Sequence, residues 1–281
     1  MTLATLADVL HPALRDGYAV AGLVVLGWED ARAYATAAQD EGAPVILQAG
    51  PGCRAHTPLP VLAAMFRTLA ADVDVPVVAH LDHGYTQDEC EAAIAEGFTS
   101  VMFDGSKLPL AENIDRTARI AEKARAAGVS LEGEIGFVGY DDGAASAATD
   151  PAEAEKFAAE SGVDAMAISI GNVHLQQESK AQVDREALAA IQAQTDLPLV
   201  IHGGSGVAPE TRAELARETA ICKFNIGTEL RMAFGSALRA ALAADPDVFD
   251  RAKILSQTED PVRQAARAVI RSMGWVGADA R

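Results

Sequence analysis

Three histidines lie at or just after the ends of short apolar runs that are far apart in the chain: His83, His174 and His202. Continuous runs of this kind are typical of strands buried on both faces of a parallel sheet. If the runs are parallel strands of one barrel, the three imidazoles lie at the same rim, where such barrels carry out their chemistry. Three imidazoles that leave a fourth position open form a catalytic metal site, most often for zinc. The pattern therefore predicts an enzyme with a metal centre.

Carboxylates stand near the same strand ends. Asp82 directly precedes His83 and could act as an acid or base beside the metal, although an aspartate there could instead form a turn or cap a helix. Asp104 ends the fourth apolar run. Glu132 and Glu134 share one face of the fifth run, because side chains alternate along a strand. Such carboxylates could bind a second metal position, hydrogen-bond the histidines, or serve as buried ion-pair partners.

Two glycine-containing loops follow the seventh and eighth runs. Loops at these positions bind phosphate in many α/β barrels, through backbone N–H groups and small hydroxyls. The residues concerned are Gly203, Gly204, Ser205 and Gly206 after the seventh run, and Asn225, Gly227 and Thr228 after the eighth. The polar segment 139–146 after the fifth run is either an ordinary surface turn or a lid that carries a carboxylate over the substrate.

Helix-like segments separate eight candidate strands. The strands are expected at residues 19–25, 44–49, 76–81, 100–104, 130–134, 165–170, 197–202 and 221–225. Thr86 with Glu89 fits a capping box, and Asp150 followed by Pro151 fits a helix start. This alternation of strand and helix favours an α/β fold, a (β/α)8 TIM barrel, over an open sheet. We expect one domain over residues 1–281, with extra C-terminal helices outside the barrel from residue 245 onward.

The composition limits the binding partners and the cellular compartment that can be expected. A net charge of −17 over 281 residues argues against nucleic acid as a partner but not against a small anionic substrate. No run approaches the roughly 20 apolar residues that a membrane span needs. The three cysteines have no paired spacing, which favours a reduced, cytoplasmic setting.

The motifs together resemble the class II, metal-dependent fructose-bisphosphate and tagatose-bisphosphate aldolases over nearly the whole chain. The matching blocks are Pro44–Gln48, His80–Gly84, Ser100–Ser106, Glu132–Glu134, Ile201–Gly206 and Lys223–Leu230. The resemblance implies a cytoplasmic carbon–carbon lyase of carbohydrate metabolism that forms a homo-dimer or homo-tetramer. It would cleave a ketose (bis)phosphate or a related ketose to dihydroxyacetone phosphate, or a similar ketone, and an aldehyde.

The same resemblance implies a role for each site residue. Zn2+ would be bound by His83, His174 and His202, and an alternate metal position, or a second divalent or monovalent cation, would lie near Asp104 and Glu134. The metal would stabilise an enediolate on the ketone half by charge.

The remaining implied roles concern protons and substrate contacts. Asp82 would handle the proton of the hydroxyl that becomes the aldehyde carbonyl. Asp141 or Asp142 of the lid would move the carbon-bound proton. The implied substrate or phosphate contacts are Gly203, Gly204, Ser205, Asn225, Gly227, Thr228, Leu175 and Gln48.

Departures from the family pattern concern the substrate rather than the metal. Val24, Gly50 and Leu175 stand where the family usually has asparagine, serine and glycine, and the lid is one residue shorter. We therefore expect an aldolase with an altered substrate that carries one phosphate or none. Arg231 and Arg271 could bind a distal phosphate or lie on the surface. The alternatives are a metal-dependent sugar-phosphate isomerase or epimerase, and a non-catalytic barrel that binds a metabolite.

Overall fold

Eight parallel strands close into a barrel in the computed structural model, which describes residues 2–141, 143–178 and 181–277. Each strand pairs with its neighbours in the sequence, and β1 pairs with β8 to close the sheet. The strands are β1 (Val20–Val24), β2 (Val45–Ala49), β3 (Val77–Gly84), β4 (Ser100–Phe103), β5 (Ser130–Ile135), β6 (Ala165–Ile168), β7 (Leu199–Ile201) and β8 (Ile221–Ile226). The predicted (β/α)8 barrel is confirmed.

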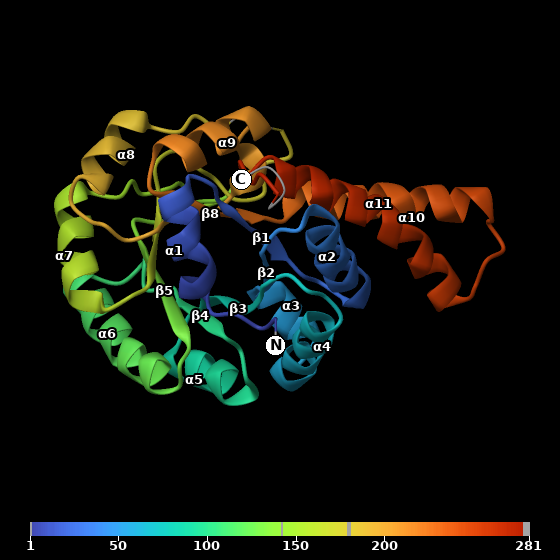
Figure 1. Ribbon diagram of the computed structural model, residues 1–281, viewed down its shortest axis with the longest axis horizontal. Coiled ribbons are helices and arrows are strands. Elements are labelled where there is room, and N and C mark those ends of the chain that lie inside the picture. Colours follow the sequence, from blue (N-terminus) through green and yellow to red (C-terminus); the bar gives the residue numbers. More distant parts are fainter. Residues whose placement is uncertain (1, 142, 179–180, 278–281) are drawn as a thin grey trace.

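Helices surround this barrel, and α10 and α11 extend to one side of it (Figure 1). The helices are α1 (Leu6–Asp16), α2 (Trp28–Glu41), α3 (Pro51–His56), α4 (Leu59–Ala71), α5 (Gln87–Glu96), α6 (Leu110–Ala126), α7 (Pro151–Ser161), α8 (Arg185–Gln192), α9 (Pro209–Glu218), α10 (Thr228–Ala244) and α11 (Arg251–Arg271). None of these helices is long and apolar enough to cross a membrane.

Local sequence signals set several of these helix starts. The Thr86 side chain accepts from the backbone N–H of Glu89, and the Glu89 side chain accepts in return from that of Thr86, which confirms the predicted capping box. The Asp150 side chain accepts from the backbone N–H groups of Ala152 and Glu153, so the predicted N-cap is also present.

Helix α1 packs against one end of the barrel, an element that the strand–helix alternation did not predict. Its apolar face, with Leu6, Val9 and Leu10, forms a separate buried cluster with inward-facing residues of the strands. These include Val20 of β1 and Val200 of β7. In Figure 1, α1 lies across the ring of strands. The barrel interior is thereby closed at the end opposite to the strands' carboxyl ends, where apolar side chains would otherwise meet water.

The C-terminal helix α11 packs on α2, which follows the first strand of the barrel. Arg263 forms two 2.6 Å hydrogen bonds with Asp40, and Arg267 and Arg271 both bind Glu41. The region after residue 245 thus adds a helix outside the barrel, as the sequence predicts. That residues 1–281 form a single domain stays a prediction.

Candidate metal centre and active site

The end of β3 is longer than expected and is irregular. The sequence predicted a strand that ends at Leu81, but β3 continues to Gly84, with a shift of register against β4 between these two residues. Within this stretch His83 has φ 51°, the left-handed region that non-glycine residues rarely adopt. In a regular strand Asp82 and His83 would point to opposite faces. The irregularity instead lets both line one cavity.

The three predicted histidines converge. Nitrogen atoms of His83, His174 and His202 all lie within 4.8 Å of one another. Their ring centroids are 4.7 Å apart for His83 and His202, and 5.4 Å apart for His83 and His174. Burial, and then the neighbouring His202 and His83, lower the pKa of His174 to about 3, so its imidazole is neutral and keeps a free lone pair. Three convergent imidazole nitrogens fit a transition-metal ion.

A second group of potential ligands shares His83 with the first. Atoms of His83, Asp104 and Glu134 also lie within 4.8 Å of one another. His83 Nδ1 is 2.8 Å from Asp104 Oδ2, and His202 Nδ1 is 3.1 Å from Glu134 Oε2. Burial would raise the pKa of Asp104, but the hydrogen bond and charge of His83 and the hydrogen bonds from Ser106 together outweigh it, and the pKa is lowered. Asp104 therefore stays ionised, and together with Glu134 it could hold a cation at an alternate position.

Behind the histidines lies a fully buried charge network centred on Glu132. One oxygen of Glu132 is 3.0 Å from His202 Nε2, and the other accepts from Lys223 Nζ at 2.6 Å. All three side chains are fully buried. Burial would lower the pKa of His202, but the hydrogen bond with Glu132 and the charge of Glu134 outweigh it and raise the pKa to about 10. The contact of Nε2 with Glu132 fixes the ring so that Nδ1 faces the metal centre, and a metal bound there would take the place of the proton on Nδ1.

His80 of β3 lies beside this network. Its Nδ1 is 2.8 Å from Ser100 Oγ, and its Nε2 is 3.8 Å from Glu132. Burial, and then the charge of Lys223, lower its pKa to about 3, so this imidazole is neutral.

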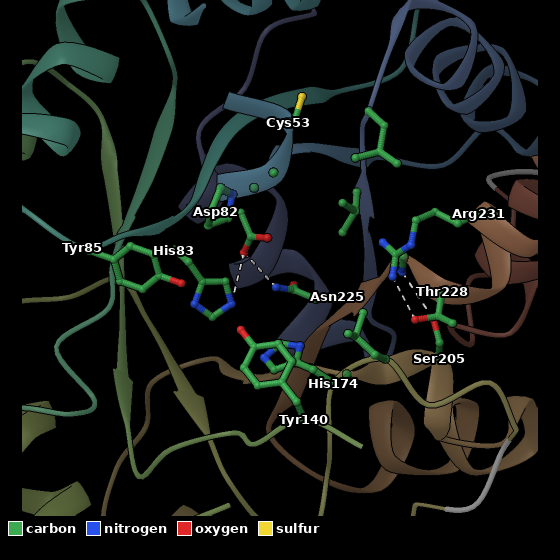
Figure 2. A pocket seen from close by; sticks show the side chains of 18 residues that line it. Cys53, Asp82, His83, Tyr85, Tyr140, His174, Ser205, Asn225, Thr228 and Arg231 are labelled. Carbon is green, nitrogen blue, oxygen red and sulfur yellow. Dashed lines mark hydrogen bonds and ion pairs between the residues drawn. The ribbon is translucent and has the colours of Figure 1, made fainter. Parts of the chain in front are cut away.

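A cavity of about 310 Å³ opens beside the metal centre. Figure 2 shows Asp82, His83, His174 and Tyr140 gathered around one side of it, with Ser205, Thr228 and Arg231 on the other. Asp82 Oδ1 accepts from the Asn225 amide at 3.2 Å. Burial would raise the pKa of Asp82, but the charges of the neighbouring histidines and Lys223 outweigh it and lower the pKa. Asp82 is therefore an ionised carboxylate held in place beside the histidines.

The far side of the cavity is built from the loops after β7 and β8. Helix α10 begins at Thr228, so its first N–H groups point toward this side. Ser205 Oγ accepts from the backbone N–H of Gly227 at 3.3 Å, and Arg231 Nη2 donates to Thr228 Oγ1 at 3.0 Å. Hydroxyls, a helix start and a guanidinium together suit an anionic group.

The structure places most of the predicted substrate contacts on this cavity. Those that line it are Leu175, Gly203, Ser205, Asn225, Gly227 and Thr228. Gln48 and Gly204 do not line it. Gln48 is fully buried inside the barrel, where its amide lies near Gly22 of β1. A Cβ on Gly204 would face Ile226 and Phe224 of β8.

The predicted lid is present only in part among the described residues. Gly139 and Asp141 form backbone hydrogen bonds with His174, so the base of the loop is attached beside a candidate ligand. Tyr140 lines the cavity, and its ring lies 5.1 Å from that of His174. The Asp141 side chain is exposed and does not line the cavity. Asp142 lies outside the described residues.

Two arginines contribute to the site: Arg231, for which the sequence left open a phosphate contact or a surface position, and Arg54, which sequence reasoning passed over. Arg231 lines the cavity, whereas Arg271 pairs with Glu41 at the surface. The signal for Arg231 was its position three residues after Thr228, which places both on one face of α10. Arg54 binds the backbone oxygens of Ala49, Asp82 and His83, so it holds the irregular end of β3 in place.

Comparisons with known proteins agree with this geometry. The family model for class-II fructose-bisphosphate aldolase matches residues 4–278. The chain belongs to this family. It is 36% identical to a fructose-bisphosphate aldolase of Geobacillus stearothermophilus over 284 residues, which cover 99% of each chain. It is 34% identical to a Staphylococcus epidermidis fructose-bisphosphate aldolase over 98% of each.

A solved structure shows the same arrangement of the chain. The YdjI aldolase from Escherichia coli K12 is 27% identical and superposes with a TM-score of 0.83, over 99% of this chain and 100% of that one. Enzymes of this family are metal-dependent aldolases, lyases that cleave a carbon–carbon bond by retro-aldol chemistry. The expectation of an aldolase with a metal centre is therefore confirmed at the level of the family.

Proposed function

We propose that the protein is a zinc-dependent aldolase that cleaves a phosphorylated ketose into a ketone phosphate, such as dihydroxyacetone phosphate, and an aldehyde. The observation that carries this proposal is the convergence of His83, His174 and His202 within 4.8 Å, beside the buried Asp82 and a cavity with an anion-binding side. Membership of the aldolase family supports the reaction type.

The donor set fits the metal that the family requires. His83, His174 and His202 would hold Zn2+, and Asp104 and Glu134 could hold it, or a second cation, at an alternate position. When bound, the metal supplies Lewis-acid stabilisation of negative charge on the ketone half. Glu132 orients His202 from behind, and Asp104 does the same for His83.

Asp82 is the proposed acid–base group for the bond-breaking step. In cleavage its carboxylate accepts the proton of the substrate hydroxyl, the oxygen becomes the aldehyde carbonyl, and the carbon–carbon bond breaks with its electron pair left on the ketone half. In condensation Asp82 returns that proton to the aldehyde oxygen. The Asn225 amide fixes Asp82 Oδ1, and Gly50 leaves the other oxygen room, because a Cβ there would lie 3.4 Å from Oδ2.

The phosphate of the ketone half would bind Ser205, Thr228 and the backbone of Gly203 and Gly227, while Arg231, which lies beside Val24 and Asp30 at the edge of the cavity, remains the candidate for a distal phosphate. The lid would then supply the group that protonates the ketone carbon. Asp141 or Asp142 remains the proposed carrier of that proton. For Asp141 to do so, the loop must turn its exposed side chain inward, while the hydrogen bonds to His174 hold the loop base.

The proposal is tested with protein stripped of metal and reloaded with Zn2+, using a panel of ketose phosphates and NMR to identify products. We expect chelator-reversible cleavage. Asp82→Asn should lower kcat by about 10²–10⁴-fold, the usual contribution of a positioned acid–base group. Asp88→Asn, at an exposed position of α5, is the matched control. Full activity without metal would contradict the proposal, as would an isomerised or epimerised ketose as the only product.

The cellular location and the oligomeric state of the protein remain proposals. All three cysteines, Cys53, Cys90 and Cys222, are buried free thiols, which supports a reducing, cytoplasmic location. The projecting pair α10 and α11 supports assembly into a homo-dimer or homo-tetramer, because it presents exposed apolar side chains such as Phe249, which is 94% exposed between the two helices. Gel filtration with light scattering measures the assembly.

A further inference from the structure

The loop after β5 brings one more polar group to the metal centre, the phenol of Tyr140. Its ring is stacked on that of His174, with the ring centroids 5.1 Å apart and the ring planes inclined by 28°. Figure 2 shows the Tyr140 hydroxyl turned toward His83, and Tyr140 lines the cavity. The reaction proposed above uses the imidazoles and Asp82 but gives this hydroxyl no role.

The backbone on both sides of Tyr140 holds it against His174. The His174 N–H donates to the Gly139 carbonyl at 2.8 Å, and the Asp141 N–H donates to the His174 carbonyl at 3.1 Å. These two hydrogen bonds form a parallel bridge that pairs Tyr140 with His174. Residues paired across such a bridge place their side chains on the same face, which explains why the two rings stack.

A tight turn with a glycine leaves room for the tyrosine ring. The Tyr140 N–H donates to the Ala144 carbonyl at 3.0 Å, and the Gly143 N–H donates to the Tyr140 carbonyl at 3.1 Å. A Cβ on Gly143 would lie 3.0 Å from Tyr140 Cβ, so a side chain at this position would press on the tyrosine. Tyr140 thus reaches the metal centre with the loop in the position that the structure shows.

The neighbouring Asp141 faces the other way. Side chains alternate along an extended segment, so the inward position of Tyr140 turns Asp141 outward. The Asp141 side chain is accordingly exposed and does not line the cavity. Of the described loop residues, 136–141 and 143–149, Tyr140 alone lines the cavity.

The surroundings of the Tyr140 hydroxyl suit a hydrogen-bond donor. Burial, and then the charges of Asp104, Glu134 and Asp82, raise the pKa of this phenol, so it keeps its proton. These three carboxylates are the ones that surround the candidate metal centre. Within the described part of the chain the hydroxyl donates to no protein acceptor. A neutral phenol has one O–H to donate, and here it is available to a ligand.

We propose that Tyr140 is a further catalytic residue, whose hydroxyl donates a hydrogen bond to an oxygen of the ketone half beside the histidines. This inference rests on the proposed aldolase function and deepens it. In cleavage the carbon–carbon bond breaks with its electron pair left on the ketone half, so negative charge develops on the oxygens of that half. A donor that is already in position stabilises this charge without reorganisation. The phenol keeps its proton throughout, so the proton transfers remain those of Asp82 and the loop aspartates.

The first test removes the hydroxyl and keeps the ring, with Tyr140→Phe in the zinc-loaded full chain. We expect kcat for the best-cleaved ketose phosphate to fall by at least about tenfold, with KM little changed, because the lost interaction forms only as charge develops. Tyr18→Phe is the matched control, since it removes a phenol hydroxyl in the cluster that closes the opposite end of the barrel, and it should leave kcat unchanged. An unchanged kcat in Tyr140→Phe overturns the inference.

Two binding measurements separate a catalytic role from a structural one. Competition with a chelator of known zinc affinity should give the same affinity for Tyr140→Phe and the wild type, because the ring stays on His174. Calorimetry with a hydroxamate that mimics the charged ketone half should show binding to the variant that is weaker by at least about tenfold. A loss of zinc affinity that accounts for the lost activity overturns the inference, as does unchanged binding of the hydroxamate.

Proton exchange separates failure of this inference from failure of the proposed function. An aldolase exchanges a carbon-bound proton of dihydroxyacetone phosphate with deuterated solvent in the absence of aldehyde, which NMR detects. We expect slower exchange in Tyr140→Phe, because the same oxygens of the ketone half become charged in this half-reaction. Exchange at the wild-type rate in the variant overturns the inference alone. A wild-type protein that shows neither exchange nor cleavage overturns the proposed function itself.

Discussion

Replacing Glu132 by glutamine should weaken both the fold and the metal centre, because one buried carboxylate serves both. Glu132 and Lys223 are fully buried and 2.6 Å apart, so Glu132→Gln leaves the lysine charge without its partner. Breaking a buried pair from one side costs about 3–5 kcal/mol. That is a large part of a total folding free energy of about 5–15 kcal/mol. Urea unfolding of the metal-free protein measures this loss.

The effect on the metal is separate and smaller. Glu132 fixes His202 through a 3.0 Å contact with Nε2, so its loss frees the ring that must present Nδ1 to the ion. Loss of such a support lowers metal affinity by about 10–100-fold, or about 1.4–2.7 kcal/mol. Competition with a chelator of known zinc affinity measures it.

Two further variants test whether Glu132 supports both the fold and the metal centre. Glu132→Gln combined with Lys223→Met removes the stranded charge, so stability should return most of the way while zinc affinity stays low. Glu112→Gln, in an exposed i,i+4 pair with Arg116, should change stability by less than about 0.5 kcal/mol. If Glu132→Gln behaves like Glu112→Gln in both assays, the network does not support the fold or the site as argued.

Three other results are expected. Leu175 has φ 64° where glycine is favoured, so Leu175→Gly should raise the free energy of unfolding by about 1 kcal/mol in urea titrations, and a loss of stability would contradict the backbone argument. Removal of metal by a chelator should lower Tm and Zn2+ should restore it, since a ligand bound only to the folded state stabilises it; an unchanged Tm would argue against a bound ion. The hydrogen bonds of Arg263 lower the pKa of Asp40, so their stabilisation is present above about pH 4 and is lost as the pH falls through the lowered value. The Tm difference between the wild type and Arg263→Gln should therefore be present at pH 7 and disappear in acid. A difference that persists at pH 2 would show that it does not depend on the ionised Asp40.

The barrel could be predicted from the sequence because its strands are buried on both faces and alternate with helices. The predicted strand ranges differ from the observed ones by at most two residues at either end, except that β3 ends three residues later than predicted. The convergence of the three histidines followed from the same logic, since the carboxyl ends of parallel strands meet at one rim.

What could not be predicted depends on contacts between distant segments. The extension of β3 and the left-handed His83 are held by Arg54, which lies on α3 and binds carbonyl oxygens that no sequence pattern marks. The location of Arg231 depends on where α10 begins relative to the cavity. Gln48 matched a family block, but its alternation along β2 places it on the same face as Ile46, inside the barrel and away from the lining of the cavity.

The attachment of α11 to α2 has a consequence for how the chain matures during synthesis. The ribosome synthesises the chain at about 5–20 residues per second, so β1 and α2 emerge early and α11 emerges last. The guanidinium partners of Asp40 and Glu41 therefore emerge only after more than two hundred further residues have been made. β1 also waits for β8 as its second neighbour. The nascent chain accordingly displays an open sheet edge until β8 has been made, and premature termination before Ile226 should yield an aggregation-prone fragment rather than a smaller working enzyme.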